Sequence, residues 1–344
     1  MNLETLAKLA GVSVATVSKA FAGSGEISEE TRKRIFGIAR ENGCFDKYNK
    51  NRFGKKVFAV ICPEVKSEYY SAILTAFDKE ITARGGIMAV SVTDFSPERE
   101  NELFTYYASY CKADGIILVN QRCFIENALR VPAVSVFPSR EAAGNENMDD
   151  ITSDMLSSIR KAVLYLKENG HRAIGFAGER LTMSKLEGFK TAMREAGLAV
   201  TDEYIKVSDL RFEEAGMEIM DAWLASGKAP GAILAAYDYI AIGIVKSLRC
   251  AGYEVPRDFT VIGMDDISVI PYLDTPLSSI KTHVDEACRA AVELILKKID
   301  NRYYRARQGI TVPSEFIPRG GGNVPLQFTR GGDAPLQFTR GKSD

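Results

Sequence analysis

The chain has 344 residues, of which 46% are hydrophobic, and a formal net charge of −1, so it can bury a large core and divide into two or three domains. It has no apolar run of membrane-spanning length and no basic stretch followed by an apolar one at the N-terminus. We therefore expect no membrane span, no secretory signal and a cytoplasmic location. Two histidines and six scattered cysteines exclude a metal-ligand cluster and a disulfide framework, so we expect reduced, buried thiols and no cofactor.

The first 43 residues have the pattern of three short helices. Apolar residues recur at i, i+3, i+4 and i+7 in the first of them: Leu3, Leu6, Ala7 and Ala10. Asn2 is the expected N-cap of this helix, Gly11 ends it, and Ser13 can cap the next one. A third helix is expected from Ser28 to Asn42-Gly43. The spacing predicts a helix-turn-helix.

The second helix has side chains small enough for a close approach to a DNA groove. Lys19 extends past them and can donate to guanine in the major groove. Val14 and Ala15 can contact a thymine methyl group, while Thr16 and Ser18 can bind phosphates. The alternative is a small helical bundle with a polar face, because the motif sets the geometry and not the ligand.

The charge distribution supports contact with DNA at this end of the chain. Residues 1–56 contain 11 basic and 6 acidic side chains, a net charge of +5, and the remainder carries −6. Attraction to phosphate therefore belongs to this basic arm and not to the acidic body.

Several runs closely resemble the N-terminal domain of the lac repressor family of bacterial transcription regulators. They are LA at 6–7, AGVSVATVSK at 10–19 and ISEETR at 27–32. Four later runs extend the resemblance to about residue 318: GHR at 170–172, LEGF at 186–189, VPRD at 255–258 and VIGMDD at 261–266.

The resemblance implies roles for individual residues of the second helix, which lies in the major groove in that family. Val14, Ala15 and Lys19 match base-reading positions. Ser13, Thr16 and Ser18 match positions that face phosphate, and Asn2 joins them as a DNA-binding candidate. Ala22 replaces a common asparagine, so the resemblance does not carry the DNA contact of that asparagine over to this chain.

From residue 57 onward, short β-branched runs alternate with helical segments. Strands are expected at 57–62, 87–92, 115–119, 132–136, 173–177, 203–208, 231–235 and 259–263. This alternation predicts an α/β core of two doubly wound parallel-sheet lobes joined to the small all-α domain. The polar stretch from Ser139 to Asp150 marks the expected first crossing between the lobes.

Small molecules bind beyond the carboxyl ends of the strands in such sheets, so the residues that follow each strand are candidates for an effector site. Those we select are Tyr69, Tyr70, Lys185, Arg211, Tyr237, Asp238 and Asp265. The tyrosines can stack on a ring and the aspartates can accept hydroxyl hydrogen bonds. The alternative for each aspartate is that it caps the helix that follows.

The resemblance implies that Asp238 and Asp265 contact a sugar-like effector. It also shows departures, because Lys185 stands where arginine is usual and Tyr237 where asparagine is common. Near Arg211 the family usually has an aromatic ring, which a one-residue shift would place at Leu210. The effector expected is a sugar or a sugar acid. If Lys185 and Arg211 both face the cleft, we expect it to carry a carboxylate or phosphate.

The segment from residue 45 to 56 differs from the hinge of the family, which usually carries a leucine that kinks the duplex. It is shorter and has no leucine, so either Phe53 or Tyr48 acts as the wedge or the segment is a flexible basic linker. Residues 319–344 contain a ten-residue unit that occurs twice, for which we expect disorder. No leucine heptad follows the core, which favours a dimer over a tetramer.

These patterns predict a helix-turn-helix domain at 1–44, a linker at 45–56, a two-lobed effector and dimerisation domain at 57–318 and a tail at 319–344. The function expected is a DNA-binding transcription regulator, a repressor controlled by a small carbohydrate-like effector through a homodimer on operator DNA. A periplasmic-type solute receptor shares the two-lobed body but lacks the basic arm. An enzyme would need a nucleophile elbow, phosphate loop or dinucleotide motif, which the sequence lacks.

Overall fold

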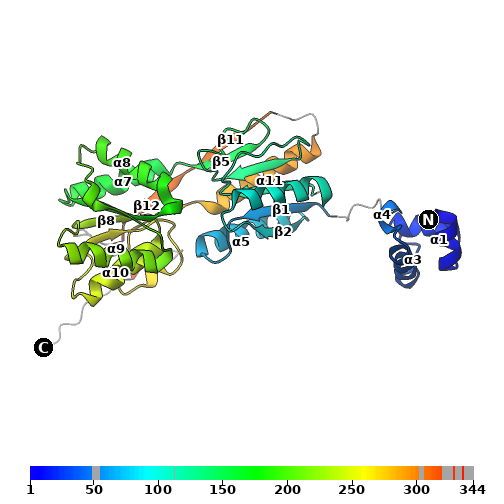
Figure 1. The fold of residues 1–344 in the computed structure, drawn as a ribbon, viewed down its shortest axis with the longest axis horizontal. Helices are drawn as coiled ribbons and strands as arrows, with labels where there is room; N and C mark the ends of the chain where they lie inside the picture. The colour runs from blue at the N-terminus through cyan, green and yellow to red at the C-terminus, as the bar shows by residue number, and fades with distance from the viewer. Residues whose placement is uncertain (49–54, 112, 302–305, 320–327, 330–334, 337–344) are drawn as a thin grey trace.

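The structure is a computed structural model that describes residues 1–48, 55–111, 113–301, 306–319, 328–329 and 335–336. Figure 1 shows a small helical domain at the N-terminus, set apart from an elongated α/β core of two lobes. None of the helices described is long and apolar enough to span a membrane.

The N-terminal domain contains the three predicted helices and one further turn. Its helices are α1 (Leu3–Ala10), α2 (Val14–Phe21), α3 (Glu29–Glu41) and α4 (Phe45–Tyr48). Gly11 has a left-handed φ of 63°, which ends α1 and turns the chain into α2. Leu6, Val17 and Ile35 are fully buried and come from α1, α2 and α3, so the three helices share one core.

The short helix α4 lies in the segment that was predicted as a linker. Its Phe45 packs on Phe36 with ring centroids 5.1 Å apart, and the guanidinium of Arg40 lies over the Phe45 ring at 4.4 Å. Tyr48 contacts Phe21 and donates a hydrogen bond to the carbonyl of Met1 at 2.8 Å. Tyr48 is therefore packed on the helical domain and is not an exposed wedge. Phe53, the other wedge candidate, lies outside the described residues.

The first lobe, which we call the N-lobe, has a six-stranded parallel sheet in the order β11-β5-β4-β3-β1-β2. The strands are β1 (Val57–Cys62), β2 (Ile87–Val92), β3 (Gly115–Val119), β4 (Ala133–Val136), β5 (Asp149–Ser153) and β11 (Gly309–Val312). Helices α5 (Glu68–Ala83) and α11 (Val284–Asp300) pack together on one face. Helix α6 (Pro97–Thr105) and the π-helix η1 (Tyr106–Tyr110) cover the other.

The second lobe, the C-lobe, has a four-stranded parallel sheet in the order β7-β6-β8-β9. The strands are β6 (Ile174–Glu179), β7 (Ile205–Ser208), β8 (Ala232–Ala235) and β9 (Thr260–Ile262). In Figure 1, α7 (Met155–Glu168) and α8 (Met183–Glu195) lie on one side of it, and α9 (Phe212–Ser226) and α10 (Asp238–Cys250) on the other. Three 3-10 turns complete the lobe: η2 (Arg180–Thr182), η3 (Asp202–Tyr204) and η4 (Ile270–Tyr272).

The chain crosses between the lobes three times. The expected crossing at Ser139–Asp150 is wrong in position, because β5 pairs with β4 and the chain leaves the N-lobe only after Ser153. It returns between β10 (Ser279–Thr282) and α11, then crosses again between β11 and β12 (Ser314–Ile317), which pairs antiparallel with β10. These crossings place the carboxyl ends of β1, β6, β8 and β9 around one cleft.

The eight strands predicted from the sequence are all present, each within a few residues of its expected bounds, which confirms the doubly wound parallel core. The thiols differ from expectation, since Cys111 and Cys250 are exposed. In the repeated tail the structure describes two short strands, β13 (Phe328–Thr329) and β14 (Pro335–Leu336), which pair antiparallel. The rest of the tail after Arg319 lies outside the described residues.

Candidate functional site: a helix face and an interlobe cleft

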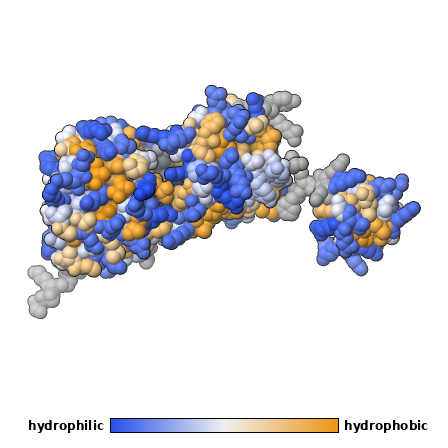
Figure 2. Space-filling model, viewed as in Figure 1, coloured by the Kyte–Doolittle hydropathy of each residue, from blue (hydrophilic) through white to orange (hydrophobic). Residues whose placement is uncertain are grey.

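The first candidate site is the outer face of α2. Val17, Ala20 and Phe21 are buried against the other helices, which fixes the orientation of α2. The opposite face carries Ser13, Val14, Ala15, Ser18 and Lys19, all exposed, with Thr16 partly exposed. Figure 2 shows that hydrophilic residues surround the rim of this domain in the view given. The structure therefore brings six of the seven predicted DNA-binding residues to one accessible surface.

Asn2 and Ser13 have structural roles that the sequence also predicted. Oδ1 of Asn2 accepts from the backbone N–H of Thr5 at 2.8 Å, and Oγ of Ser13 accepts from that of Thr16 at 3.0 Å. Both residues are N-caps, of α1 and α2. The cap at Ser13 places the positive end of the α2 dipole at the surface, where it can attract a phosphate.

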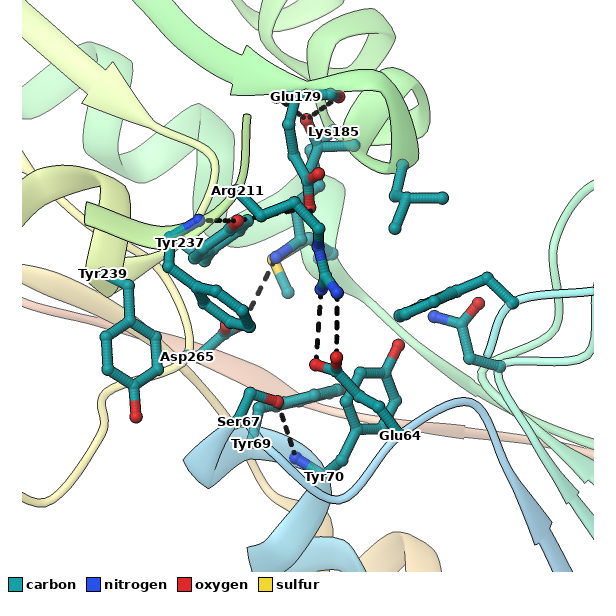
Figure 3. A pocket seen from close by; sticks show the side chains of 16 residues that line it. Glu64, Ser67, Tyr69, Tyr70, Glu179, Lys185, Arg211, Tyr237, Tyr239 and Asp265 are labelled. Carbon is teal, nitrogen blue, oxygen red and sulfur yellow. Dashed lines mark hydrogen bonds and ion pairs between the residues drawn. The ribbon is translucent and has the colours of Figure 1, made fainter. Parts of the chain in front are cut away.

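The second candidate site is a cleft lined by residues of both lobes (Figure 3), with a cavity volume of about 120 Å³. Six of the seven predicted effector-binding residues line it: Tyr69, Tyr70, Lys185, Arg211, Tyr237 and Asp265. They are grouped because parallel strands of both lobes end at this cleft.

Arg211 is the best-connected cation of the cleft. Its Nη1 and Nη2 donate to Glu64 at 2.8 and 3.3 Å, and its Nε donates to Glu179 at 3.3 Å. Glu64 follows β1 of the N-lobe, whereas Glu179 is the last residue of β6 in the C-lobe. Figure 3 shows the two parallel contacts between the guanidinium and Glu64. Such bidentate pairs are the strong form of the charge-assisted hydrogen bond.

Lys185 also forms an ion pair with a carboxylate, in this case within the C-lobe. Its Nζ lies 3.2 Å from Oδ1 of Asp265 and donates to the carbonyl of Ala236 at 2.8 Å. Lys185 and Arg211 thus both line the cleft, but both already contact carboxylates. Because Glu64, Glu179 and Asp265 outnumber the two cations, the lining has no excess of positive charge for an anionic ligand.

Tyr237 and Glu179 form a buried hydrogen-bonded pair beneath Arg211. The Tyr237 hydroxyl donates to Oε1 of Glu179 at 3.2 Å and accepts from the backbone N–H of Phe212 at 2.9 Å. Burial raises the pKa of Glu179, an effect that Arg211 and Tyr237 only partly offset. Burial likewise raises the pKa of the Tyr237 hydroxyl. Both groups anchor Arg211 and Phe212 at the start of α9.

Asp238 is the one predicted effector-binding residue that does not line the cleft. Its side chain is fully buried at the start of α10 and accepts from Ser279 Oγ at 2.7 Å and from the backbone N–H of Ile267 at 2.9 Å. Burial raises the pKa of this carboxyl well above its ordinary value. Asp238 therefore neither lines the cleft nor caps α10, whose N-cap is Tyr237. Its carboxylate ties the start of α10 to the loop after β9.

Uncharged groups with spare hydrogen-bonding capacity line the N-lobe side of the cleft. In the part of the chain that the structure describes, the hydroxyls of Tyr69 and Tyr70 and the side-chain amide of Asn120 make no hydrogen bond to other residues. Phe95, Phe212 and Tyr239 add aromatic surface. This combination suits a small, neutral, polar ligand with at least one flat apolar face.

The cleft residues that were missed in the sequence include Glu64, Phe95 and Glu179. Glu179 lies inside β6, so a search confined to residues after each strand passes over it. Glu64 lies two residues beyond β1, ahead of the residues that we selected there. No pattern in the sequence points to Phe95. It reaches the cleft because its positive φ of 60° turns the loop in that direction, which only the structure shows.

Two family models match the chain. One, described as bacterial regulatory proteins of the lacI family, matches residues 2–43, and the other, described as a periplasmic binding protein-like domain, matches residues 163–321.

One relative is the HTH-type transcriptional repressor CytR of Escherichia coli strain K12. It is 29% identical over 331 residues, which cover 93% of this chain and 95% of the relative.

Two solved structures have the same fold. A transcriptional regulator CelR–cellobiose complex gives a TM-score of 0.67 at 22% identity, covering 94% of this chain and 100% of the other. The lac repressor dimer bound to operator and the anti-inducer ONPF gives 0.69 at 19% identity, covering 92% and 98%.

Proposed function

The chain belongs to the lacI family of bacterial regulatory proteins, and on that premise we propose that it is a cytoplasmic transcription repressor whose affinity for operator DNA is controlled by a small molecule bound between its lobes. The observation that carries the proposal is the exposed face of α2. It presents short side chains and Lys19 outward while the opposite face fixes the helix in the domain core.

For DNA recognition, we assign base contacts to Val14, Ala15 and Lys19. The phosphate contacts go to Ser13, Thr16 and Ser18, and we keep Asn2, the N-cap of α1, as a further DNA-binding residue. In the free protein Nζ of Lys19 lies 2.5 Å from Glu26, an exposed pair that contributes little stability. Lys19 can therefore exchange Glu26 for a guanine at low cost.

A two-fold homodimer suits this mode of binding. One α2 helix reads only a few base pairs, and a dimer doubles the contact by placing two of them in half-sites about one helical turn apart. The lac repressor structure is such a dimer on its operator. We propose the same assembly on a pseudo-palindromic operator, with the recognition domain at 1–44, the linker at 45–56 and the effector and dimerisation domain at 57–318.

For the effector, we propose a neutral carbohydrate-like molecule in the interlobe cleft. The related CelR structure holds cellobiose, a neutral sugar, in agreement with this choice. The unpaired hydroxyls of Tyr69 and Tyr70 supply hydrogen bonds, and Asp265 and Lys185 supply charged acceptors and donors. This neutral effector replaces the acidic one that was expected from Lys185 and Arg211, because both side chains already form ion pairs with carboxylates of the protein.

Control follows from linkage between the two sites. An effector that prefers one arrangement of the lobes changes operator affinity by the same factor that the operator changes effector affinity. Couplings of this kind are about 1–3 kcal/mol, roughly 5–150-fold.

The test is a selection of genomic DNA fragments by the purified protein at physiological salt, repeated with a variant that lacks residues 1–56. We expect the full chain to enrich a pseudo-palindrome and the shortened one to enrich nothing. If the full chain enriches no sequence while its cleft binds a sugar in a calorimetric titration, the protein is a solute sensor and the proposal is wrong.

A further inference from the structure

The cleft is crossed by a side chain of the protein itself. Arg211 extends from the C-lobe and its guanidinium lies 4.6 Å from the ring centroid of Phe212 and 4.8 Å from that of Phe95, which belongs to the N-lobe. The same guanidinium donates twice to Glu64 of the N-lobe and once to Glu179 of the C-lobe (Figure 3). One planar cation thus joins rings and carboxylates from both lobes.

Glu68, the first residue of α5, follows the loop that carries Glu64 and also contacts the C-lobe. Oε1 of Glu68 accepts from the backbone N–H of Ser268 at 2.5 Å, and the Tyr239 hydroxyl accepts from the backbone N–H of Glu68 at 3.4 Å. The loop after β1 is therefore docked on the C-lobe by contacts within the chain. The strongest of these is the bidentate pair, because both its partners are charged and Glu64 is nearly buried.

The space that remains in the cleft is small. A cavity of about 120 Å³ is below the roughly 300–1,000 Å³ of ordinary small-molecule sites. The guanidinium of Arg211 lies against aromatic rings, in the position that a flat ligand would take. A ligand of ordinary size therefore needs this side chain to move.

We propose that Arg211 is a built-in occupant of the effector site, which holds the lobes closed through Glu64 until the effector displaces its guanidinium from between Phe95 and Phe212. The inference rests on the proposed function only in treating the cleft as the effector site. It adds that closure without effector comes from an ion pair of the chain, and that the effector competes with this pair.

Displacement of Arg211 also restricts the chemistry of the effector. It would leave Glu64 and Glu179 as acceptors on either side of the space between the rings of Phe95 and Phe212, which we call the slot. A flat molecule rich in hydrogen-bond donors can satisfy both carboxylates, whereas an anion would be repelled by them. We therefore assign this part of the site to the donor-bearing, uncharged face of the effector.

Two exposed native cysteines allow the closure to be measured. Cys111 follows η1 in the N-lobe and Cys250 ends α10 in the C-lobe, while Cys44, Cys62 and Cys288 are buried. Nitroxide labels on Cys111 and Cys250, with Cys123 changed to serine, report the interlobe distance by electron paramagnetic resonance. Dilution with unlabelled protein removes distances between protomers. The measurement needs neither DNA nor effector.

The decisive comparison uses two carboxylates that each form a bidentate pair with an arginine. Glu64→Gln removes the negative charge and one of the two acceptor oxygens from the pair that crosses the cleft, so we expect a shift of the distance distribution to longer values. Glu195→Gln makes the same change in the pair with Arg160, which lies elsewhere in the C-lobe, and is expected to leave the distribution unchanged. Equal distributions for Glu64→Gln and wild type, or equal shifts for both variants, would overturn the proposal.

A chemical rescue tests the slot itself. Arg211→Ala is expected to open the lobes, and low millimolar guanidinium chloride is expected to close them again, because the free ion can occupy the same position. Sodium chloride at equal ionic strength should not do so, and Arg160→Ala, which breaks a bidentate pair with Glu195 elsewhere in the C-lobe, should stay closed throughout. Opening that guanidinium fails to reverse would contradict the assignment of the slot.

The two proposals can fail separately. A fragment selection that enriches no operator would reject the DNA-binding function and leave the distance results intact. An unchanged interlobe distance in Glu64→Gln would reject the proposal that Arg211 holds the lobes closed, and would leave the operator-binding function intact. Circular dichroism identifies a variant that does not fold, and if Arg211→Ala is one, Glu64→Gln still decides the question.

Discussion

Nζ of Lys19 lies 2.5 Å from Oε2 of Glu26, so the side chain assigned to base reading is held by a carboxylate of its own domain when no DNA is bound. Both side chains are more than half exposed, and salt weakens such a pair. The contact holds Lys19 only weakly in the free protein, so its side chain can leave Glu26 when DNA binds.

The first prediction concerns this residue. Lys19→Ala should weaken operator binding by about 1–3 kcal/mol, roughly 5–150-fold, and relax the preference for one base, since a base contact is lost. Lys33→Ala, which removes an exposed charge from α3, should weaken binding to operator and random DNA by the same factor. Fluorescence anisotropy on both DNAs measures this. Equal losses on the two DNAs for Lys19→Ala would rule out base reading.

Two variants of Ser13 test its capping role and its DNA contact separately. Ser13→Ala removes the N-cap of α2 and should cost about 0.5–2 kcal/mol in the free energy of unfolding of the N-terminal domain. Ser13→Asp keeps a capping oxygen and should unfold like wild type, yet bind DNA less tightly because its charge would face phosphate. Thermal unfolding and anisotropy together check both parts. Normal DNA affinity in Ser13→Asp would show that Ser13 faces no phosphate.

Asp265 tests the effector site. Asp265→Asn breaks the ion pair with Lys185 inside the cleft but touches nothing in the N-terminal domain. We expect operator affinity within about twofold of wild type and loss of the effector response. Asp209→Asn, which breaks an exposed pair with Arg180 outside the cleft, is the matched control and should respond normally. Retention of the response in Asp265→Asn would remove that residue from the site.

The buried carboxyl of Asp238 should make the free energy of unfolding depend on pH. Burial raises the pKa of its carboxyl in the folded state well above the ordinary value of 3.8, so between these values the folded state binds more protons than the unfolded state. The contribution to stability is therefore full below the ordinary value and is lost as pH rises through the folded pKa. Urea unfolding between about pH 4 and pH 9 should show wild type losing stability relative to Asp238→Asn. Parallel curves would contradict this.

Much of the architecture could be predicted from local patterns. Helices α1 to α3 have caps and apolar spacing that tertiary contacts only reinforce, and the buried parallel strands are continuous β-branched runs. Strands β5, β10, β11 and β12 were not predicted. They contain polar residues such as Asp149 and Ser314, and they form where the chain passes between lobes, which depends on long-range topology.

The cleft, too, could be predicted only in part, because some of its residues depend on contacts that are distant in the sequence. Six of the selected residues follow strands and line the cleft, as the rule for parallel sheets predicts: Tyr69, Tyr70, Lys185, Arg211, Tyr237 and Asp265. Asp238 obeys the same rule but is directed into the core by Ser279 and Ile267, residues that no local pattern connects to it. The partners of Arg211 lie 147 and 32 positions away, so its neutralisation could not be read from the sequence.

The most direct test of effector-controlled DNA binding is a calorimetric titration of the full chain with a panel of neutral sugars, in the presence and absence of the selected operator fragment. We expect at least one sugar to bind with a Kd that differs roughly 5–150-fold between the two conditions, and to shift operator affinity by the same factor. A sugar that binds the cleft with one and the same Kd in both conditions would show that the cleft and the DNA-binding face are uncoupled.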